Sequence, residues 1–252
     1  MEVKTILVTQ ARMGSTRLPG KVLLEVNKTP LLKIHLDRLS ESKKVDKIIV
    51  ATTDNFEDGI IEKLAIEWGY EVYRGSKDDV LDRFYQAVKD IEPTWVVRVT
   101  SDCPLIDSKL IDSVISLAQV NNVDYCANVL IEEFPDGQDV EVFKFSALEL
   151  AWTHAKLKSE REHVTPYIVD NTTFKGGKLF SAVNFPCFTN FSSIRMTVDQ
   201  PRDFELIHRV INDLGTGQSW IEYTNHIIKN ELYKMNSDII RNEGMLISLK
   251  NN

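Results

Sequence analysis

Residues 4–21 read KTILVTQARMGSTRLPGK. The apolar, β-branched run over 4–9 predicts a strand buried on both faces, which is typical of a parallel sheet. The loop that follows, residues 10–21, places three cations and two glycines at the carboxyl end of that strand. Ligands of open α/β sheets bind beyond the carboxyl ends of the strands, so we expect this loop to line a binding site.

Strand and helix patterns alternate as far as about residue 130, and this alternation predicts a mainly parallel sheet with helices on both faces. Short apolar runs predict the strands, and apolar residues at three- and four-residue spacing predict the helices. The expected strands are 47–52, 71–73, 95–100 and 124–129, and the expected helices are 30–39, 56–68, 79–91 and 108–121.

The pattern changes after residue 130, where the turn cluster FPDGQ occupies residues 134–138. We interpret the whole chain, 1–252, as one domain with an insertion at about 131–192. Beyond the turn we expect strands at 139–143, 179–185 and 193–198, and helices at 147–156, 160–169, 201–214 and 220–235.

The chain has 252 residues and a formal net charge of −7, which argues against binding to nucleic acid or to an anionic membrane. Residues 1–50 hold ten Lys/Arg against five Asp/Glu, so the excess positive charge lies in the part of the chain that contains the first loop. Three widely spaced cysteines favour neither a disulfide framework nor a zinc site. With no signal-peptide pattern and no long apolar segment, the sequence predicts a cytoplasmic protein.

The composition of the first loop suits phosphate binding. Gly14 and Gly20 allow backbone N–H groups to approach phosphate oxygens, while Arg12, Arg17 and Lys21 supply positive charge. Five residues separate the glycines and valine follows Lys21, so the loop is not a GxxxxGK[ST] phosphate loop. The alternative interpretation is an ordinary basic surface loop.

Two aspartates follow predicted strands directly. Asp102 follows 95–100, and Asp199 follows 193–198 and precedes the helix that begins at Pro201. Taken alone, each is better interpreted as a turn or helix-cap residue than as a ligand. Together, beside a basic glycine loop, two carboxylates are what a Mg²⁺–nucleoside triphosphate site needs, because magnesium takes one or two carboxylates plus phosphate oxygens.

The loop QARMGSTRLPGKVL closely resembles the corresponding loop of bacterial sugar cytidylyltransferases, including the CMP-KDO synthetases and especially their spore-coat-polysaccharide relatives. The resemblance covers most of the chain. Further stretches match in order: RGSKDDVLDR (74–83), VVRVTSDCPLID (96–107), FPDGQDVEVF (134–143), SEREHVTPYI (159–168) and RMTVDQPRDFELI (195–207). The acceptor-side stretches differ from those of the KDO enzymes, so KDO itself is not the expected acceptor.

The resemblance implies a GT-A-like nucleotide-diphospho-sugar transferase fold and Mg²⁺-dependent transfer of CMP from CTP to an acidic sugar or related acceptor. It further implies a homodimer and a role in surface polysaccharide or glycoconjugate biosynthesis. The implied catalytic residues are Arg12, Lys21, Asp102 and Asp199, and the metal ligands are Asp102 and Asp199. The implied nucleotide-binding residues are Gln10, Ala11, Arg12, Gly14, Ser15, Arg17, Lys21, Arg74, Ser76 and Asp102, and the acceptor-binding residues are Asp136, Gln138, Glu141, Arg161 and His163.

Two other function classes are compatible with this fold. A nucleotide-sugar-dependent glycosyltransferase would need a DxD-like metal motif, whereas the chain has Ser101-Asp102-Cys103 at that place. A non-catalytic nucleotide-binding protein would not need the full set of arginine, lysine and aspartate residues. From the sequence we assign no residue as a general base for the reaction.

Overall fold

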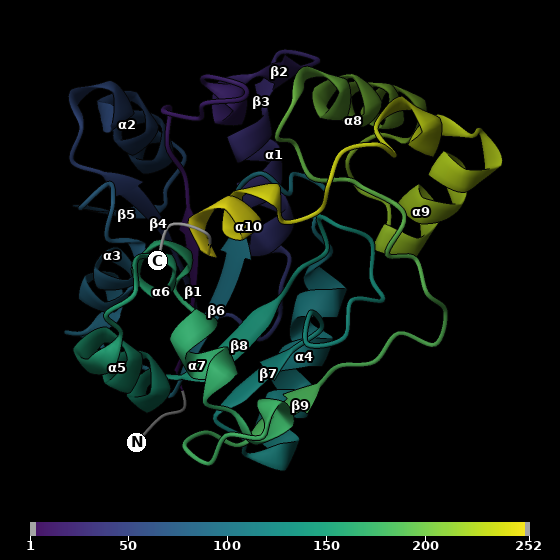
Figure 1. The fold of residues 1–252 in the computed structure, drawn as a ribbon. Helices are drawn as coiled ribbons and strands as arrows, with labels where there is room; N and C mark the ends of the chain where they lie inside the picture. Colours follow the sequence, from purple (N-terminus) through teal and green to yellow (C-terminus); the bar gives the residue numbers. More distant parts are fainter. Residues whose placement is uncertain (1–3, 250–252) are drawn as a thin grey trace.

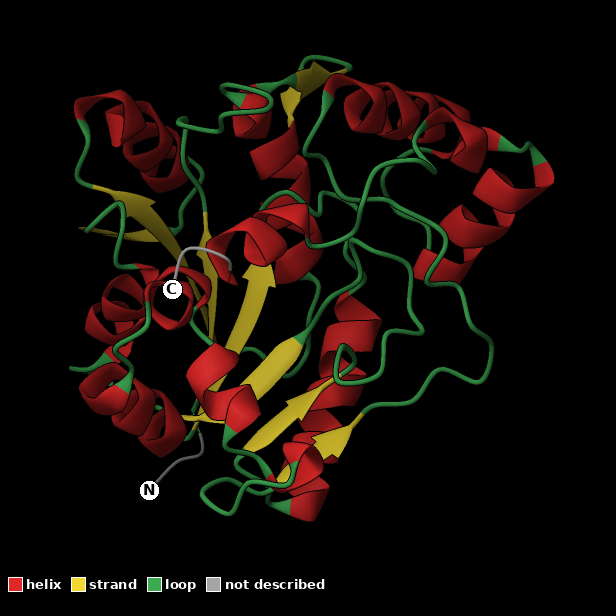
Figure 2. Ribbon diagram, in the orientation of Figure 1, coloured by secondary structure: helices red, strands yellow, loops and turns green. Residues whose placement is uncertain are grey.

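The computed structural model describes residues 4–249 and is built around one seven-stranded sheet with helices on both faces (Figures 1 and 2). The order across the sheet is β5-β4-β1-β6-β8-β7-β9, and all neighbours are parallel except β8, which runs antiparallel to β6 and β7. The strands are β1 Thr5–Gln10, β4 Lys47–Thr53, β5 Glu71–Gly75, β6 Trp95–Thr100, β7 Tyr125–Ala127, β8 Glu141–Lys144 and β9 Ala182–Asn184; β2 Glu25–Val26 and β3 Thr29–Pro30 pair separately. The predicted α/β class with a mainly parallel sheet is confirmed.

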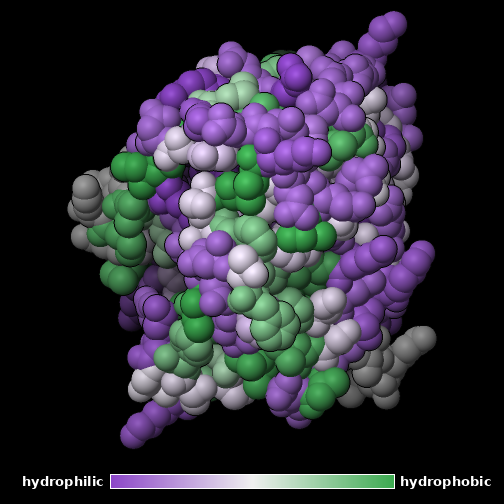
Figure 3. Space-filling view, turned by 90° about the vertical axis from the view of Figure 1, so that its right-hand side faces the viewer, coloured by the Kyte–Doolittle hydropathy of each residue, from purple (hydrophilic) through white to green (hydrophobic). Residues whose placement is uncertain are grey.

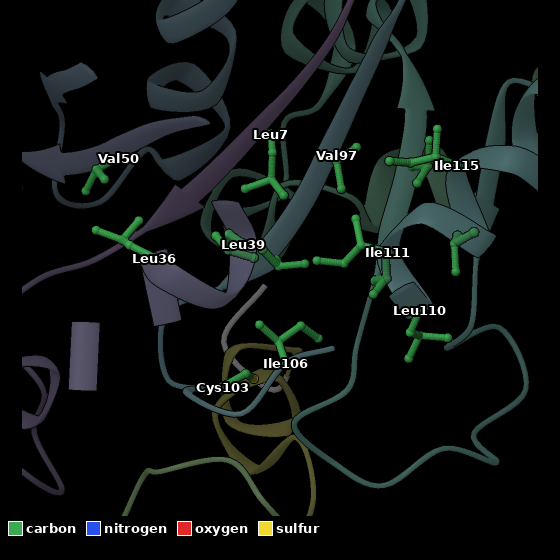
Figure 4. Close-up of a cluster of buried hydrophobic side chains, with 14 of the residues drawn as sticks. Leu7, Leu36, Leu39, Val50, Val97, Cys103, Ile106, Leu110, Ile111 and Ile115 are labelled. Atoms are coloured by element: carbon green, nitrogen blue, oxygen red, sulfur yellow. The ribbon is translucent and has the colours of Figure 1, made fainter. Parts of the chain in front are cut away.

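Alternate side chains of the strands project to opposite faces, and each face carries its own apolar cluster. Leu7 of β1 packs with α1 and α4 on one face, as Figure 4 shows, whereas Ile6 and Val8 pack on the other. The first face is covered by α1 Leu31–Ser40, α2 Gly59–Glu67 and α4 Ser108–Asn121, and the second by α3 Val80–Val88, α5 Phe145–His154, α6 Lys158–His163 and α7 Pro166–Asp170.

A third apolar cluster lies beyond the carboxyl end of the sheet, between α8 Pro201–Leu214, α9 Trp220–Lys229 and the start of α1. The helix α10 Glu243–Leu249 follows and returns toward the sheet (Figure 1). Four short 3-10 turns complete the described elements: η1 Lys21–Leu23, η2 Phe56–Asp58, η3 Thr173–Lys175 and η4 Leu232–Met235.

Three sequence predictions are wrong in detail. The helix expected at 160–169 is two helices, because Val164 has a left-handed φ of 73° and Pro166 begins a new helix. The strand expected at 193–198 does not form; this segment makes one isolated bridge, Asp136 to Arg195. The helix expected at 220–235 ends at Lys229 and continues only as η4.

The segment 131–192 contributes β8 and β9 to the central sheet, so these parts of the predicted insertion lie in the main layer. Cys103 and Cys126 are buried and all three thiols are free. Within residues 4–249, none of the helices has the length and apolar character that a membrane span requires. Figure 3 shows a face on which hydrophilic side chains dominate the upper part and apolar patches occur lower down.

Buried His35 joins α1 to β1 and to the loop after β6. Its Nδ1 lies 2.9 Å from the Cys103 carbonyl oxygen and therefore donates, which leaves Nε2 to accept from Thr9 Oγ1 at 2.9 Å. Burial lowers the pKa of His35 to about 4, although the Cys103 carbonyl favours the charged form.

This buried imidazole predicts a loss of stability in acid. The unfolded chain takes up the His35 proton near pH 6.5, whereas the native state does so only near pH 4, so stability falls as the pH decreases between these values. When the pH is lowered from 7.5 to 5, the free energy of unfolding of the wild type should fall by about 2 kcal/mol more than that of His35→Gln, which has no titratable group at this position. Urea unfolding at the two pH values measures this difference. An equal loss in both proteins would contradict the assignment.

Candidate active site

The candidate site lies where the chain order across the sheet reverses. From β1 the chain adds β4 and β5 on one side and then crosses to place β6 on the other, so β1 and β6 flank a topological switch point. Ligands of open α/β sheets bind at such points, beyond the carboxyl ends of the strands. The first loop and the loop that begins at Ser101 meet there, because Ser101 Oγ donates to the Gln10 carbonyl oxygen at 2.6 Å.

The first loop is folded back on itself. The Met13 carbonyl oxygen accepts from the N–H groups of Ser15 and Gly20, both at 2.9 Å, and Met13 N–H donates to Asp58 Oδ1 at 2.6 Å. Gly20 adopts a left-handed φ of 68°, a conformation that favours glycine, and caps the turn that begins at Lys21. The backbone therefore turns Lys21 back toward the end of β6.

Lys21 joins the two aspartates that the sequence singles out. Its Nζ lies 3.0 Å from Asp102 Oδ2 and 2.8 Å from Asp199 Oδ1. Arg17 contacts the same Asp199 oxygen at 3.1 Å. The structure thus brings together two cations and two carboxylates from segments that are up to 182 residues apart in the sequence.

A third cation, Arg195, contacts the Asp199 oxygen that Lys21 does not contact. Buried Arg195 donates to Asp199 Oδ2 at 2.9 Å, to Asp203 Oδ1 at 2.9 Å and to Asp136 Oδ2. Asp203 also accepts from the N–H of Asp199 at 3.0 Å, which fixes the turn that carries Asp199. Sequence reasoning missed Arg195 and Asp203 because their partners are recognisable only when the segments meet.

The charges in this group stabilise one another. Burial alone would raise the pKa of Asp102, but the Lys21 ammonium outweighs it and holds that pKa well below its ordinary value. Burial would lower the pKa of Lys21, yet the two carboxylates raise it above its ordinary value. Lys21 is therefore an ammonium and Asp102 a carboxylate across the neutral range.

The two carboxylates suit a hard divalent cation. Asp102 and Asp199 converge on one position, that of Lys21 Nζ, and carboxylate oxygens are the ligands that Mg²⁺ prefers. Among residues 4–249, no group of three or more His, Cys, Asp or Glu side chains is arranged to hold a metal ion. A cation at this pair would thus take its remaining ligands from a substrate and from water, as magnesium usually does.

A second polar group lies on the sheet face that α6 covers. Arg98 of β6 pairs with Glu141 of β8, whose other oxygen accepts from Tyr125 Oη at 2.6 Å. His163 ends α6, and burial lowers its pKa. Three buried atoms of these side chains have no hydrogen-bond partner among residues 4–249: Gln10 Oε1, Arg98 Nε and His163 Nε2.

The remaining loop residues are open to solvent or shape the backbone. Arg12 is exposed and makes no hydrogen bond or ion pair with any residue between 4 and 249. Gly14 and Ser15 are half-buried in the loop. Ala11 is buried, and its N–H donates to the Ala51 carbonyl oxygen at 3.1 Å, which continues the pairing of β1 with β4.

Two residues predicted to bind the nucleotide also make contacts that hold parts of the protein together. Arg74 donates to the carbonyl oxygens of Thr53 and Asn55 and pairs with Glu62 at 2.9 Å, so its guanidinium holds the loop after β4. Ser76 Oγ accepts from the Asp79 N–H at the start of α3.

Three predicted acceptor-binding residues are also occupied by partners within the chain. Buried Gln138 accepts from the Asp107 N–H and donates to the Leu105 carbonyl oxygen. Arg161 forms a two-nitrogen contact with Asp79, and Asp136 is paired with Arg195. Of the predicted acceptor group, only Glu141 and His163 lie in the polar cluster with unpaired atoms.

Comparison with known proteins finds similarity along most of the chain. A family model described as Cytidylyltransferase matches residues 6–239. An uncharacterised protein of Methanocaldococcus jannaschii is 45% identical over 81% of this chain and 82% of its own length. The spore coat polysaccharide biosynthesis protein SpsF of Bacillus subtilis is 33% identical over 83% of this chain and 87% of its own. A solved cytidylyltransferase from Leptospira borgpetersenii is 35% identical and superposes with a TM-score of 0.87 over 95% of this chain and 100% of its own.

Proposed function

Because the chain belongs to the cytidylyltransferase family, we propose that it transfers CMP from CTP to an acidic sugar or related acceptor, releasing pyrophosphate, with Mg²⁺ as cofactor. The observation that carries this proposal is the convergence of Asp102 and Asp199 on one cation position, with Lys21 and Arg17 beside it. That position lies at the switch point of the sheet, where α/β proteins bind nucleotides.

The cationic residues would stabilise the charge that develops during transfer. An acceptor oxygen attacks the α-phosphorus in line with the leaving pyrophosphate, and negative charge builds on the leaving and equatorial oxygens. Arg17 and Lys21 contact the carboxylates of the site, and Arg12 belongs to the same loop. Fixed cations aimed at developing charge are a main source of rate enhancement. Mg²⁺ bound at Asp102 and Asp199 would supply further neutralisation of phosphate oxygens.

Lys21 would change partners when the nucleotide binds. Without a nucleotide its ammonium neutralises the two carboxylates, which otherwise repel each other. A triphosphate offers Lys21 oxygens of higher charge, and the carboxylates become free to accept a different cation. Arg195 keeps Asp199 oriented during this exchange, because its hydrogen bond is to the oxygen that Lys21 does not use.

For the acceptor we propose the polar cluster on the sheet face below α6. Gln10, Arg98 and Glu141 project to that face, and His163 at the end of α6 is close enough to interact with the charges of Arg98 and Glu141. The unpaired Gln10 Oε1, Arg98 Nε and His163 Nε2 need partners, because an unsatisfied buried polar atom costs about 1–3 kcal/mol. Hydroxyl and carboxylate groups of an acidic sugar would satisfy them.

The biological setting is part of the same proposal. SpsF carries spore coat polysaccharide biosynthesis in its name, so we infer that the CMP-activated product of this chain supplies a surface polysaccharide or glycoconjugate. We also propose that the enzyme works in the cytoplasm as a homodimer, binds neither nucleic acid nor membrane, and uses segment 131–192 for acceptor binding and dimerisation.

The proposal predicts pyrophosphate release that requires both CTP and an acceptor. We would test four nucleoside triphosphates against 2-keto-3-deoxy acids, nonulosonic acids, sugar phosphates and phosphonates, with and without Mg²⁺. We expect turnover with CTP and an acidic acceptor, and its loss on chelation. Sugar transfer without pyrophosphate would favour a glycosyltransferase, and CTP binding without turnover for any acceptor would favour a non-catalytic protein.

A further inference from the structure

The C-terminal segment 240–249 lies next to the candidate site, near the carboxyl end of β6. Figure 1 shows α10, in yellow, in front of the carboxyl end of β6 and close to α6. Arg241 anchors the start of the segment, with hydrogen bonds to the Phe134 carbonyl oxygen at 3.1 Å and to Asp139 Oδ1 at 2.8 Å. We call residues 240–249 the C-terminal strap; it lies beyond residues 6–239, the range that the family model matches.

The strap contacts the phosphate loop through one acidic residue. Glu243 Oε2 lies 2.8 Å from Arg17 Nη1, while Arg17 Nη2 contacts Asp199 at 3.1 Å. Arg17 is thus held between two carboxylates, one of which belongs to the site and one to the strap. A carboxylate and a phosphate present similar oxygens to a guanidinium, so Glu243 occupies Arg17 as a phosphate would.

The other end of the strap contacts the acceptor side. Ser248 Oγ donates to Glu162 Oε2 at 2.8 Å, and Glu162 precedes His163 at the end of α6. The strap therefore connects the loop proposed for the triphosphate with the helix proposed for the acceptor. Its contacts are replaceable, because Arg17 and Glu243 are each about one-third exposed (33% and 36%) and such pairs are weak.

We propose that the C-terminal strap closes the site in the absence of nucleotide, and that a polyphosphate opens it by displacing Glu243 from Arg17. This inference rests on the proposed function, because it takes Arg17 as a triphosphate-binding residue. It follows that Glu243 competes with the nucleotide and that removing its charge strengthens polyphosphate binding.

Calorimetry tests this competition with two probes, inorganic tripolyphosphate and CTP, both in magnesium-containing buffer. Glu243→Gln keeps the shape of the side chain and removes its charge, so we expect Kd for both probes to fall about two- to fivefold, the range that a partly exposed ion pair contributes. The matched control is Glu71→Gln, which removes a carboxylate paired with Lys47 on an edge strand; its Kd values should equal those of the wild type.

Hydrogen exchange gives a second measurement on the wild-type chain. Saturating tripolyphosphate should increase amide exchange in the strap, while amides of β1 and β6 stay protected. Unchanged or weaker probe binding in Glu243→Gln, or unchanged strap exchange, would overturn the proposal. If tripolyphosphate binds more tightly to the variant but CTP binds to neither protein, the strap proposal stands and the proposed function fails.

Discussion

Lys21→Met is expected to reduce kcat/KM for CTP-dependent pyrophosphate release by two to three orders of magnitude, the usual cost of removing one transition-state contact. Methionine preserves most of the side-chain volume, so the change isolates the charge. Two effects combine: the developing phosphate charge loses a cation, and Asp102 and Asp199 lose the ammonium that they share. Steady-state kinetics with varied CTP and fixed acceptor measure the change.

Lys47→Met is the matched control, because Lys47 also pairs with a carboxylate, Glu71 at 2.7 Å, but at the amino ends of β4 and β5, away from the candidate site. Its turnover should match that of the wild type. Far-UV circular dichroism and thermal unfolding of both variants would show whether lost activity reflects lost structure. Turnover of Lys21→Met within threefold of the wild type, in a folded protein, would refute the assignment of Lys21 to the reaction.

The regular elements could be predicted where the local sequence alone determines them. β6 and α8 run over the predicted residues, because β6 is rich in apolar and β-branched residues and α8 begins at a proline, which suits the first position of a helix. Segment 193–198 has an alternating pattern but forms no strand. Met196 N–H donates to the Asp136 carbonyl oxygen and Val198 N–H to that of Asp102, so its backbone is satisfied by two separate loops.

The site could be predicted only in part, for a related reason. Asp102 and Lys21 lie in short motifs next to predicted strands, so the sequence places them at one edge of the sheet. Whether a polar residue faces a ligand depends instead on its partners in space. Gln138 and Arg161 lie in matching motifs, yet their polar atoms bond to distant parts of the chain.

The role of Arg195 likewise depends on residues that the sequence does not place beside it. Its partners range from Asp199, four residues away, to Asp136, 59 residues away. Within its own segment, Arg195 resembles any charged residue on an exposed strand. In the structure, Arg195 is buried among three carboxylates. Burial would lower the pKa of Arg195, but the aspartates outweigh this effect and raise it.

Arg195→Met is expected to destabilise the protein by about 3–5 kcal/mol, because removing one partner of a buried ion pair leaves uncompensated charge. For a chain of this size the melting temperature should fall on the order of 10 °C. Three carboxylates, those of Asp136, Asp199 and Asp203, would lose their common cation. Urea and thermal unfolding of the variant at pH 8 measure the effect.

A matched control variant and the pH dependence of stability separate the contribution of the Arg195 charge from that of its packing. Arg202→Met removes a guanidinium that contacts Asp238 through two nitrogens at the surface, and its stability should stay close to that of the wild type. Burial raises the pKa of Asp136 even though Arg195 opposes this effect, so in Arg195→Met the native pKa of Asp136 rises further above that of the unfolded chain. Lowering the pH from 8 to 5 then protonates the native state first and stabilises the variant relative to the wild type. A stability difference that stays constant over this range would show that Arg195 contributes through packing rather than through its charge.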